Sequence, residues 1–224
     1  MPLPLIRLGV VDSTQAFLER HPELGCCGVL AGEQRLGRGQ AGNTWVSRPG
    51  AGLWLSACLP APRVPPGLLL QRAMAAVVEV LEPSGAPLGL KWPNDLVARK
   101  EGRLVKVGGI IGQAKGDRVL LGLGINLEQA PDIPGRRIPP ACLRDLATGP
   151  VPAAPALARD ILDAWEDLEI LRVPPFLWPG AGDAVRWEEG QGVCVGWLGD
   201  GRLRVELAGG GFADLTAGDV SGLA

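Results

Sequence analysis

Apolar and polar residues between positions 5 and 126 form short runs that end at glycine-rich or proline-rich turns. Alternation with a period of two is typical of a half-buried strand, and a short unbroken apolar run is typical of a fully buried one. We therefore expect strands at 5–11, 28–31, 53–59, 88–92, 96–98, 104–114 and 119–126. Helical spacing predicts helices at 15–20, 68–81 and 154–171, the first with Asp12 or Ser13 as its cap.

The end of the chain has a different pattern, in which short apolar runs alternate with Gly and Asp turns. This predicts a small antiparallel barrel with strands at 184–187, 192–197, 203–207 and 211–215. Residues 127–152 and 173–179 are rich in proline and predict irregular connections. The fold class that follows is α+β, a mixed or antiparallel sheet with packed helices at 1–173 and a small β-barrel domain at 180–224.

Charge and hydropathy exclude several classes of protein. The formal net charge is −2 with acids and bases interspersed, which is unlike the basic surface of a nucleic-acid-binding domain. No segment reaches the roughly 20 apolar residues of a membrane helix, and the first residues lack the pattern of a signal peptide. We expect a cytoplasmic enzyme or binding protein with neither nucleic acid nor a membrane as its partner.

The chain offers few residue types for catalysis. Its five cysteines form no CxxC pair and lie in apolar runs, which predicts buried, reduced thiols. His21 is the only histidine, so neither a serine–histidine triad nor a histidine-rich metal site is expected. Any chemistry must therefore use lysine, arginine, carboxylates and backbone N–H groups.

A glycine-dense segment at 37–42, containing Arg38, lies between two predicted strands. Glycine lets the backbone approach a ligand closely, and successive N–H groups beside an arginine can form an anion-binding nest. A mobile surface loop is the alternative. Trp45 favours the binding loop, because a large apolar ring after such a segment is typical of a lid that closes over a ligand.

Polar residues also follow the ends of several predicted strands. Lys91, Asn94 and Asp95 surround Pro93, which ends the strand and holds these groups at its edge. An ordinary Pro-Asn-Asp turn is the alternative. Lys106 lies at the head of an apolar strand, where its charge must reach solvent or meet an anion. Asn126 ends the next strand, where its amide is free to contact a purine edge.

Taken in order, these segments resemble bacterial biotin–protein ligases in their short form, without an N-terminal DNA-binding domain. The motifs are Asp12-Ser13-Thr14, GRGQAGNTW at 37–45, KWPND at 91–95, KVGGII at 106–111 and GLGIN at 122–126. The resemblance implies a class II synthetase-like catalytic domain at 1–173 and an SH3-like domain at 180–224. It further implies that ATP and biotin, with Mg²⁺, form biotinyl-5′-AMP, and that biotin then passes to a lysine of a biotin carboxyl carrier domain. The protein itself is expected to be a monomer or a homodimer.

The resemblance also assigns roles to residues. The biotin site is expected to comprise Ser13, Thr14, Gln15, Gln34, Gly37, Arg38, Gly39, Gln40, Lys106, Gly108 and Gly109. The ATP and adenylate site is expected to comprise Arg38, Gln40, Trp45, Lys91, Asn94, Lys106 and Asn126. The catalytic residues are expected to be Arg38, Lys91, Lys106 and Asp95. Asp95 would hold Mg²⁺ or orient the incoming lysine, and the three basic side chains must converge on one cleft.

Three positions depart from the family pattern. Gln15 and Gln113 replace an asparagine and a glutamate, and Gln40 replaces the second arginine of a GRGR motif. A neutral amide cannot make the charge-assisted contact of an arginine with phosphate. We therefore expect weaker retention of the adenylate unless Arg35 or Arg48 substitutes.

Other functions compete with this one. Lipoate–protein ligases and octanoyltransferases have a related fold, but their arginine-rich glycine motif with a histidine is absent here. A non-catalytic protein that binds biotin or a carrier domain is also consistent with Gln15 and Gln40. A transcriptional repressor is disfavoured, since no DNA-binding segment precedes the first predicted strand.

Overall fold

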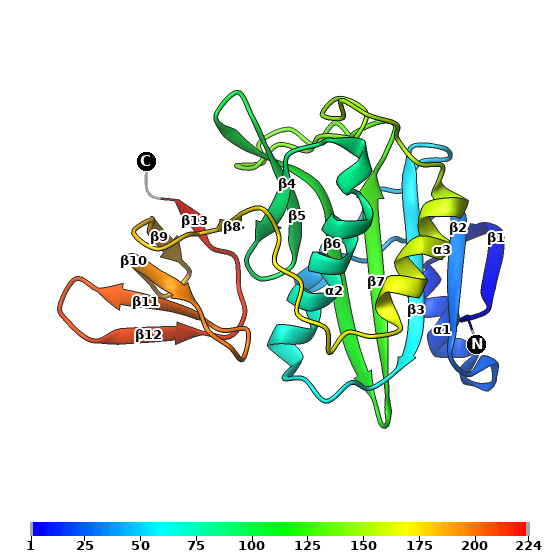
Figure 1. The fold of residues 1–224 in the computed structure, drawn as a ribbon, viewed down its shortest axis with the longest axis horizontal. Coiled ribbons are helices and arrows are strands. Elements are labelled where there is room, and N and C mark those ends of the chain that lie inside the picture. The colour runs from blue at the N-terminus through cyan, green and yellow to red at the C-terminus, as the bar shows by residue number, and fades with distance from the viewer. Residues whose placement is uncertain (1, 223–224) are drawn as a thin grey trace.

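A computed structural model describes residues 2–222. It contains two β-sheets, a larger one and a smaller one, that lie side by side (Figure 1). The larger sheet is mixed: β1 pairs with β2 and β4 with β8 in parallel, and all other neighbours are antiparallel. Its strands in spatial order are β1 (Leu5–Val11), β2 (Cys27–Gln34), β3 (Gly52–Pro60), β7 (Arg118–Asn126), β6 (Arg103–Lys115), β5 (Asp95–Lys100), β4 (Leu88–Lys91) and β8 (Leu177–Trp178). The expected mixed α+β class is confirmed.

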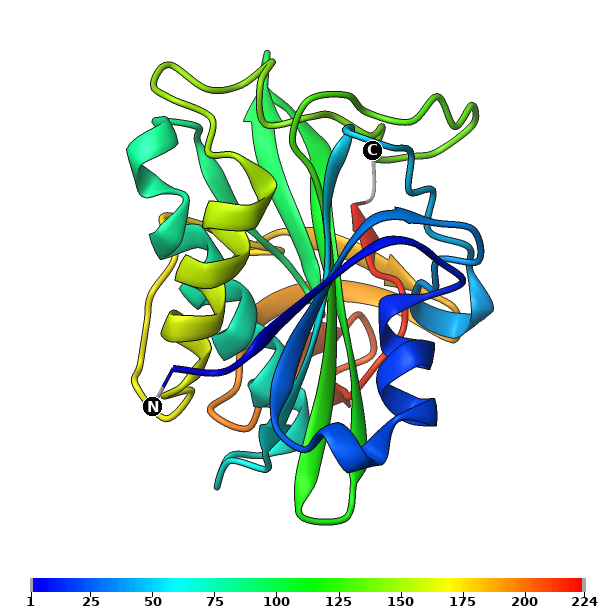
Figure 2. The same cartoon turned by 90° about the vertical axis from the view of Figure 1, so that its right-hand side faces the viewer.

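Helices cover the two faces of this sheet unequally (Figure 2). The helices α2 (Pro66–Val80) and α3 (Ala154–Trp165) pack together over one face and close the main core. The short helix α1 (Thr14–Arg20) covers only the part of the opposite face formed by β2, β3 and β7. Short 3₁₀ turns occur at η1 (Pro22–Leu24), η2 (Gln40–Gly42) and η3 (Glu82–Ser84). Within residues 2–222 no helix has the length and apolar character needed to cross a membrane.

Alternation along β3 explains this division of the sheet. Leu53, Leu55 and Ala57 point toward α2 and α3 and are fully buried in the main core. Ser56 lies between them on the opposite face, because successive side chains in a strand point to opposite sides. One face of the sheet is therefore apolar, and the other carries polar groups beside α1.

The smaller sheet is entirely antiparallel. Its order is β12 (Phe212–Leu215), β11 (Leu203–Leu207), β10 (Gly190–Trp197), β9 (Ala184–Trp187) and β13 (Ser221–Gly222). Among the described residues its end strands β12 and β13 do not pair with each other, so the expected barrel closure is not observed. Trp92, from the larger sheet, is fully buried in the core of this smaller one.

The hairpin between β10 and β11 holds the two sheets together at Gly201. Its carbonyl oxygen accepts hydrogen bonds from Gln71 Nε2 at 2.6 Å and from Trp92 Nε1 at 3.0 Å. Its φ is +90°, and a side chain there would overlap the backbone of Gly67 at the start of α2. Glycine is therefore required at this position by both conformation and space.

Several expected boundaries need correction. The helix expected at 154–171 ends at Trp165, and the irregular connection expected at 173–179 contains β8. The strand expected at 28–31 extends to Gln34, and β13 was not expected. The two missed strands are two residues long and are defined by pairing with distant strands, which leaves no periodic pattern to detect.

Candidate active site

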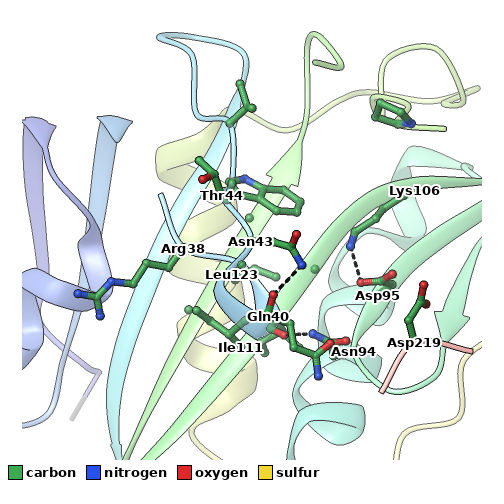
Figure 3. A pocket seen from close by; sticks show the side chains of 18 of the residues that line it. Arg38, Gln40, Asn43, Thr44, Asn94, Asp95, Lys106, Ile111, Leu123 and Asp219 are labelled. Atoms are coloured by element: carbon green, nitrogen blue, oxygen red, sulfur yellow. Dashed lines mark hydrogen bonds and ion pairs between the residues drawn. The ribbon is translucent and has the colours of Figure 1, made fainter. Parts of the chain in front are cut away.

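A cavity of about 590 Å³ opens on the sheet face opposite α2 and α3, within the 300–1,000 Å³ usual for ligand pockets (Figure 3). Its walls come from the glycine-rich loop, the ends of several strands, the connection after β7 and the segment before β13. The predicted residues that line it are Ser13, Thr14, Gln15, Gln34, Arg38, Gly39, Gln40, Trp45, Lys91, Asn94, Asp95, Lys106, Gly109 and Asn126. The fold thus brings together residues that lie far apart in the sequence.

Two predicted residues do not line this cavity. Gly108 faces the main core, where a side chain would meet Leu96, because its neighbour Gly109 already faces the cavity. Gly37 packs against the backbone of Trp45 inside the glycine-rich loop. Both glycines therefore allow close packing in this structure, and their expected part in the biotin site stays a prediction.

One end of the cavity is a connected set of hydroxyl and amide groups at the start of α1. Gln34 Oε1 accepts from the backbone N–H of Thr14 at 2.9 Å and from its hydroxyl at 3.0 Å. The Thr14 hydroxyl also lies 2.7 Å from Ser56 Oγ, and Gln34 Nε2 donates to Ser47 Oγ at 2.9 Å. Ser13 caps the helix by accepting from Ala16 N–H. These bonds fix the positions of the polar groups before any ligand binds.

Gln15 differs from its neighbours. Its side-chain carbonyl oxygen is buried, because the residue is only 6% exposed, yet it has no hydrogen-bond partner within residues 2–222. Its Oε1 lies against Gly122, where a side chain would overlap it. Leaving such a buried acceptor unpaired costs about 1–3 kcal/mol. The arrangement therefore favours a ligand that brings an N–H donor to this end of the cavity.

The indole ring of Trp45 lies against Gly124, where any side chain would overlap it. Lys106 Nζ is 5.7 Å from the centre of this ring and donates to Asp95 Oδ1 at 2.6 Å. The indole N–H of Trp45 is buried with no partner in the described part of the chain. The ring, the ammonium and the carboxylate thus form one wall of the cavity.

Lys91 is 3% exposed, and its ammonium lies where the two sheets meet. It donates to Asp219 Oδ1 at 2.7 Å and lies 5.8 Å from the centre of the Trp178 ring. Asp219 belongs to the segment before β13 and its side chain is 87% exposed. The C-terminal segment therefore supplies the charge partner of a buried lysine in the cavity.

Arg38 lines the cavity, but Figure 3 shows its guanidinium pointing away from Lys106 and Asp95. Its Nη1 donates to Glu19 Oε2 on α1 at 3.0 Å. Of the three basic side chains expected to converge, Lys91 and Lys106 direct their charges to the cavity wall. All three residues thus line one cavity, and the Arg38 guanidinium is the one that is turned away from it, toward Glu19.

The two asparagines each use their amide nitrogen to hold neighbouring backbone. Asn94 Nδ2 donates to the carbonyl of Ile110 at 2.6 Å, and Asn126 Nδ2 donates to the carbonyl of Ala141 at 3.1 Å. Asn126 Oδ1 is buried and has no partner in the described residues. This oxygen is a second acceptor available to a ligand.

Sequence reasoning missed several lining residues, namely Ser56, Gly122, Gly124, Arg136, Arg137 and Asp219. The period-two pattern of β3 could have identified Ser56, but the others lie in segments without periodicity or depend on tertiary contacts. Arg35, Arg48 and Gln113 do not line the cavity.

Metal and thiol chemistry have few available groups. No set of three or more His, Cys, Asp or Glu side chains within the described residues is placed to hold a metal ion. Mg²⁺ usually needs only one or two carboxylates together with substrate phosphates and water, and Asp95 fits that requirement. All five cysteines are free, and burial raises the pKa of the thiols of Cys27, Cys58, Cys142 and Cys194.

Comparison with known proteins gives consistent matches. The model of the biotin/lipoate A/B protein ligase family matches residues 10–128. The chain is 37% identical over 130 residues to the bifunctional ligase/repressor BirA of Bacillus subtilis, covering 54% of this chain and 37% of that protein. It is 36% identical over 112 residues to the biotin–[acetyl-CoA-carboxylase] ligase of Mycobacterium tuberculosis, covering 46% of this chain and 40% of that protein. The matched part thus spans about two fifths of these relatives.

A solved structure matches nearly the whole chain. The biotin protein ligase from Aquifex aeolicus, solved in complex with biotin and ATP, superposes with a TM-score of 0.75 and 25% identity. The match covers 97% of each chain.

Proposed function

The chain belongs to the biotin/lipoate A/B protein ligase family, and on that premise we propose that it is an ATP-dependent biotin–protein ligase. The carboxylate of biotin attacks the α-phosphate of ATP, which forms biotinyl-5′-AMP and releases pyrophosphate. The amine of an acceptor lysine then attacks the acyl carbon, forms the amide and releases AMP. The acceptor we propose is a biotin carboxyl carrier domain, in line with the relatives named as acetyl-CoA-carboxylase ligases.

The observation that carries this proposal is the unpaired acceptor Gln15 Oε1 beside the hydroxyls of Thr14 and Ser56. The ureido ring of biotin has two N–H donors and one carbonyl acceptor, which complement an amide oxygen and hydroxyl groups. The dithiolane ring of lipoate has no N–H and would leave Gln15 Oε1 unpaired. A site built to hydrogen-bond one substrate rejects an analogue that lacks the donor.

The other wall of the cavity suits the nucleotide. Asn126 Oδ1 can accept from the exocyclic amino group of adenine, and Lys106 and Lys91 offer positive charge to phosphate and carboxylate oxygens. Fixed cations in a site shielded from water are effective because they require no reorganisation as charge shifts in the transition state. Asp95 would hold Mg²⁺ with the phosphate oxygens, and the ion would neutralise part of their charge. Arg38 would have to leave Glu19 to join them.

Transfer to the acceptor lysine requires mainly positioning, because a mixed anhydride is already a good acyl donor. We further propose that residues 1–173 form the catalytic domain and 180–224 a domain of SH3-like type. The Gly201 and Asp219 contacts, which join the smaller sheet to the cavity, support a role for it in forming the site.

The decisive experiment compares pyrophosphate release from ATP with biotin and with lipoate, followed by intact-mass analysis of a biotin carboxyl carrier domain. We expect release and modification with biotin only. Preference for lipoate would identify a lipoyl-transferring enzyme. Biotin binding without pyrophosphate release would identify a non-catalytic binder, and either result would overturn the proposal.

The matched variants Q15A and Q113A test the assigned acceptor. Q15A is expected to weaken biotin binding by about 1–3 kcal/mol, the usual effect of losing a buried hydrogen-bond partner. Q113A removes the same amide from a position outside the cavity and is expected to leave biotin affinity unchanged. Equal effects of the two variants on biotin affinity would show that Gln15 does not bind biotin.

A further inference from the structure

Each of the three basic residues expected to be catalytic already has a carboxylate partner. Lys106 Nζ lies 2.6 Å from Asp95, Lys91 Nζ lies 2.7 Å from Asp219, and Arg38 Nη1 lies 3.0 Å from Glu19. Each pair is close to neutral while its carboxylate stays in place, so these pairs add little net charge to the cavity. A Mg²⁺ ion held by Asp95 would offset only part of the negative charge of a triphosphate, so further cations would help the cavity to hold ATP or an acyl-adenylate.

Two further cations line the same cavity. Arg136 and Arg137, from the connection after β7, are exposed and form no ion pair with any described residue. Gln40, from the glycine-rich loop, lines the cavity but is neutral. Arg35 and Arg48, the substitutes considered from the sequence, lie outside the lining.

The segment that carries these arginines is held at both ends. The backbone N–H groups of Leu127, Glu128 and Gln129 all donate to the carbonyl of Ala51. At the other end, Lys106 pairs through its backbone with Pro139 and Ala141. Residues 130–138 form no helix or strand and contain only a turn at Pro134–Gly135, and the connection runs across the end of the sheet (Figure 2). The arginines can therefore move toward a bound anion while Lys106 fixes the base of the segment.

We propose that Arg136 and Arg137 bind phosphate oxygens of ATP and of the acyl-adenylate and supply the positive charge that Gln40 does not. The assignment rests on the proposed ligase function, since it names the phosphate-binding residues of that same site. Guanidinium groups suit this role, because they hold phosphate through paired charge-assisted hydrogen bonds.

The test is the double variant R136Q/R137Q, with R35Q/R48Q as the matched control. Both change the charge by the same amount, but only the first pair lines the cavity. We expect R136Q/R137Q to raise the KM for ATP and the dissociation rate of biotinyl-AMP by about tenfold or more. Biotin affinity without ATP, which involves no phosphate, is expected to stay unchanged, and the control is expected to match the wild type.

Two further measurements separate phosphate binding from a structural role. Adenylate retention by the wild type should weaken as salt is raised, and R136Q/R137Q should lose part of this dependence, because exposed charges are screened. Adding Q40R to R136Q/R137Q should restore retention by returning a cation to the glycine-rich loop.

The outcomes distinguish this inference from the function on which it rests. If the wild type releases no pyrophosphate with ATP and biotin, the ligase proposal fails. If the wild type is active but R136Q/R137Q retains the adenylate equally well, or R35Q/R48Q shows the loss instead, the ligase function stands and the arginine assignment is overturned.

Discussion

Gly122 and Gly124 make room for two cavity side chains, Gln15 and Trp45. We expect G124A to lower the free energy of unfolding by about 1–3 kcal/mol, the usual cost of overpacking, and to weaken biotin binding as the indole is displaced. G9A is the control, since a side chain at Gly9 would meet nothing within 4 Å. Denaturant unfolding and biotin titration check both, and equal effects of the two variants would contradict the packing argument.

Some residues of the cavity could be identified from their positions in the sequence, and others could not. Lys91, Asp95 and Lys106 could be selected from the sequence because charges at strand ends are chemically conspicuous. The role of Gly124 could not, because it depends on Trp45, which reaches the sheet from a distant loop. The direction of the Arg38 guanidinium could not be predicted for a related reason, since its partner Glu19 lies on a different element.

Asp12 lies next to the cap of α1, and its ionisation is expected to make the stability of the fold depend on pH. Hydrogen bonds from Arg20 and from the backbone N–H of Ser13 lower the pKa of this carboxyl from 3.8 to about 2. A lowered pKa means that the stabilisation is present above pH 3.8 and is lost as the pH falls toward about 2. The stability difference between wild type and D12N should therefore shrink over that interval in denaturant unfolding. A difference that stays constant with pH would show that the ionised Asp12 carboxylate does not stabilise the fold.

Among the elements, the connection after β7 differs most from the rest. Its span at 130–138 contains only a turn at Pro134–Gly135 and no helix or strand, and such segments open more readily than strands. We expect trypsin to cut first after Arg136 or Arg137, and ATP with biotin to protect this site. The fragments can be identified by mass spectrometry. Unchanged cleavage with ligands present would show that the span does not contact them.

Long periodic elements could be predicted from the sequence, and short ones could not. The strand at Leu5–Val11 was placed with its exact bounds, and α2 within two residues. The helix at 154–171 was predicted too long, because Leu168 is apolar and buried although the helix has already ended at Trp165. An apolar residue at helical spacing reports burial, and burial does not require the helix to continue.

The two sheets share one polar link inside the cavity, the pair of Lys91 and Asp219. Removing the carboxylate leaves the buried ammonium with only the Trp92 carbonyl, 3.4 Å away, so D219A should lower the free energy of unfolding by about 1–3 kcal/mol. E206A removes an exposed carboxylate from β11 and should stay within about 0.5 kcal/mol of the wild type. Chemical denaturation measures both, and an unaffected D219A would mean that Lys91 finds another acceptor.

The contact between Lys91 and Asp219 could not be predicted from the sequence. The segments that line the cavity from the larger sheet could be recognised in order, but the sequence pattern predicts the tail as a separate barrel. Asp219 and the burial of Trp92 in the smaller sheet show that the tail completes the cavity wall. Contacts between segments more than one hundred positions apart leave no pattern in either segment alone.

The hairpin turns of the smaller sheet differ in whether a fluorescent or affinity label could be attached without disturbing the fold. Any residue inserted near Gly201 would press on α2 and on Trp92, next to Lys91, and so disturb the cavity wall. The turn at Gly209, Gly210 and Gly211 has open space around each glycine. A fluorophore or affinity tag belongs there, where it can report on the protein without altering the cavity.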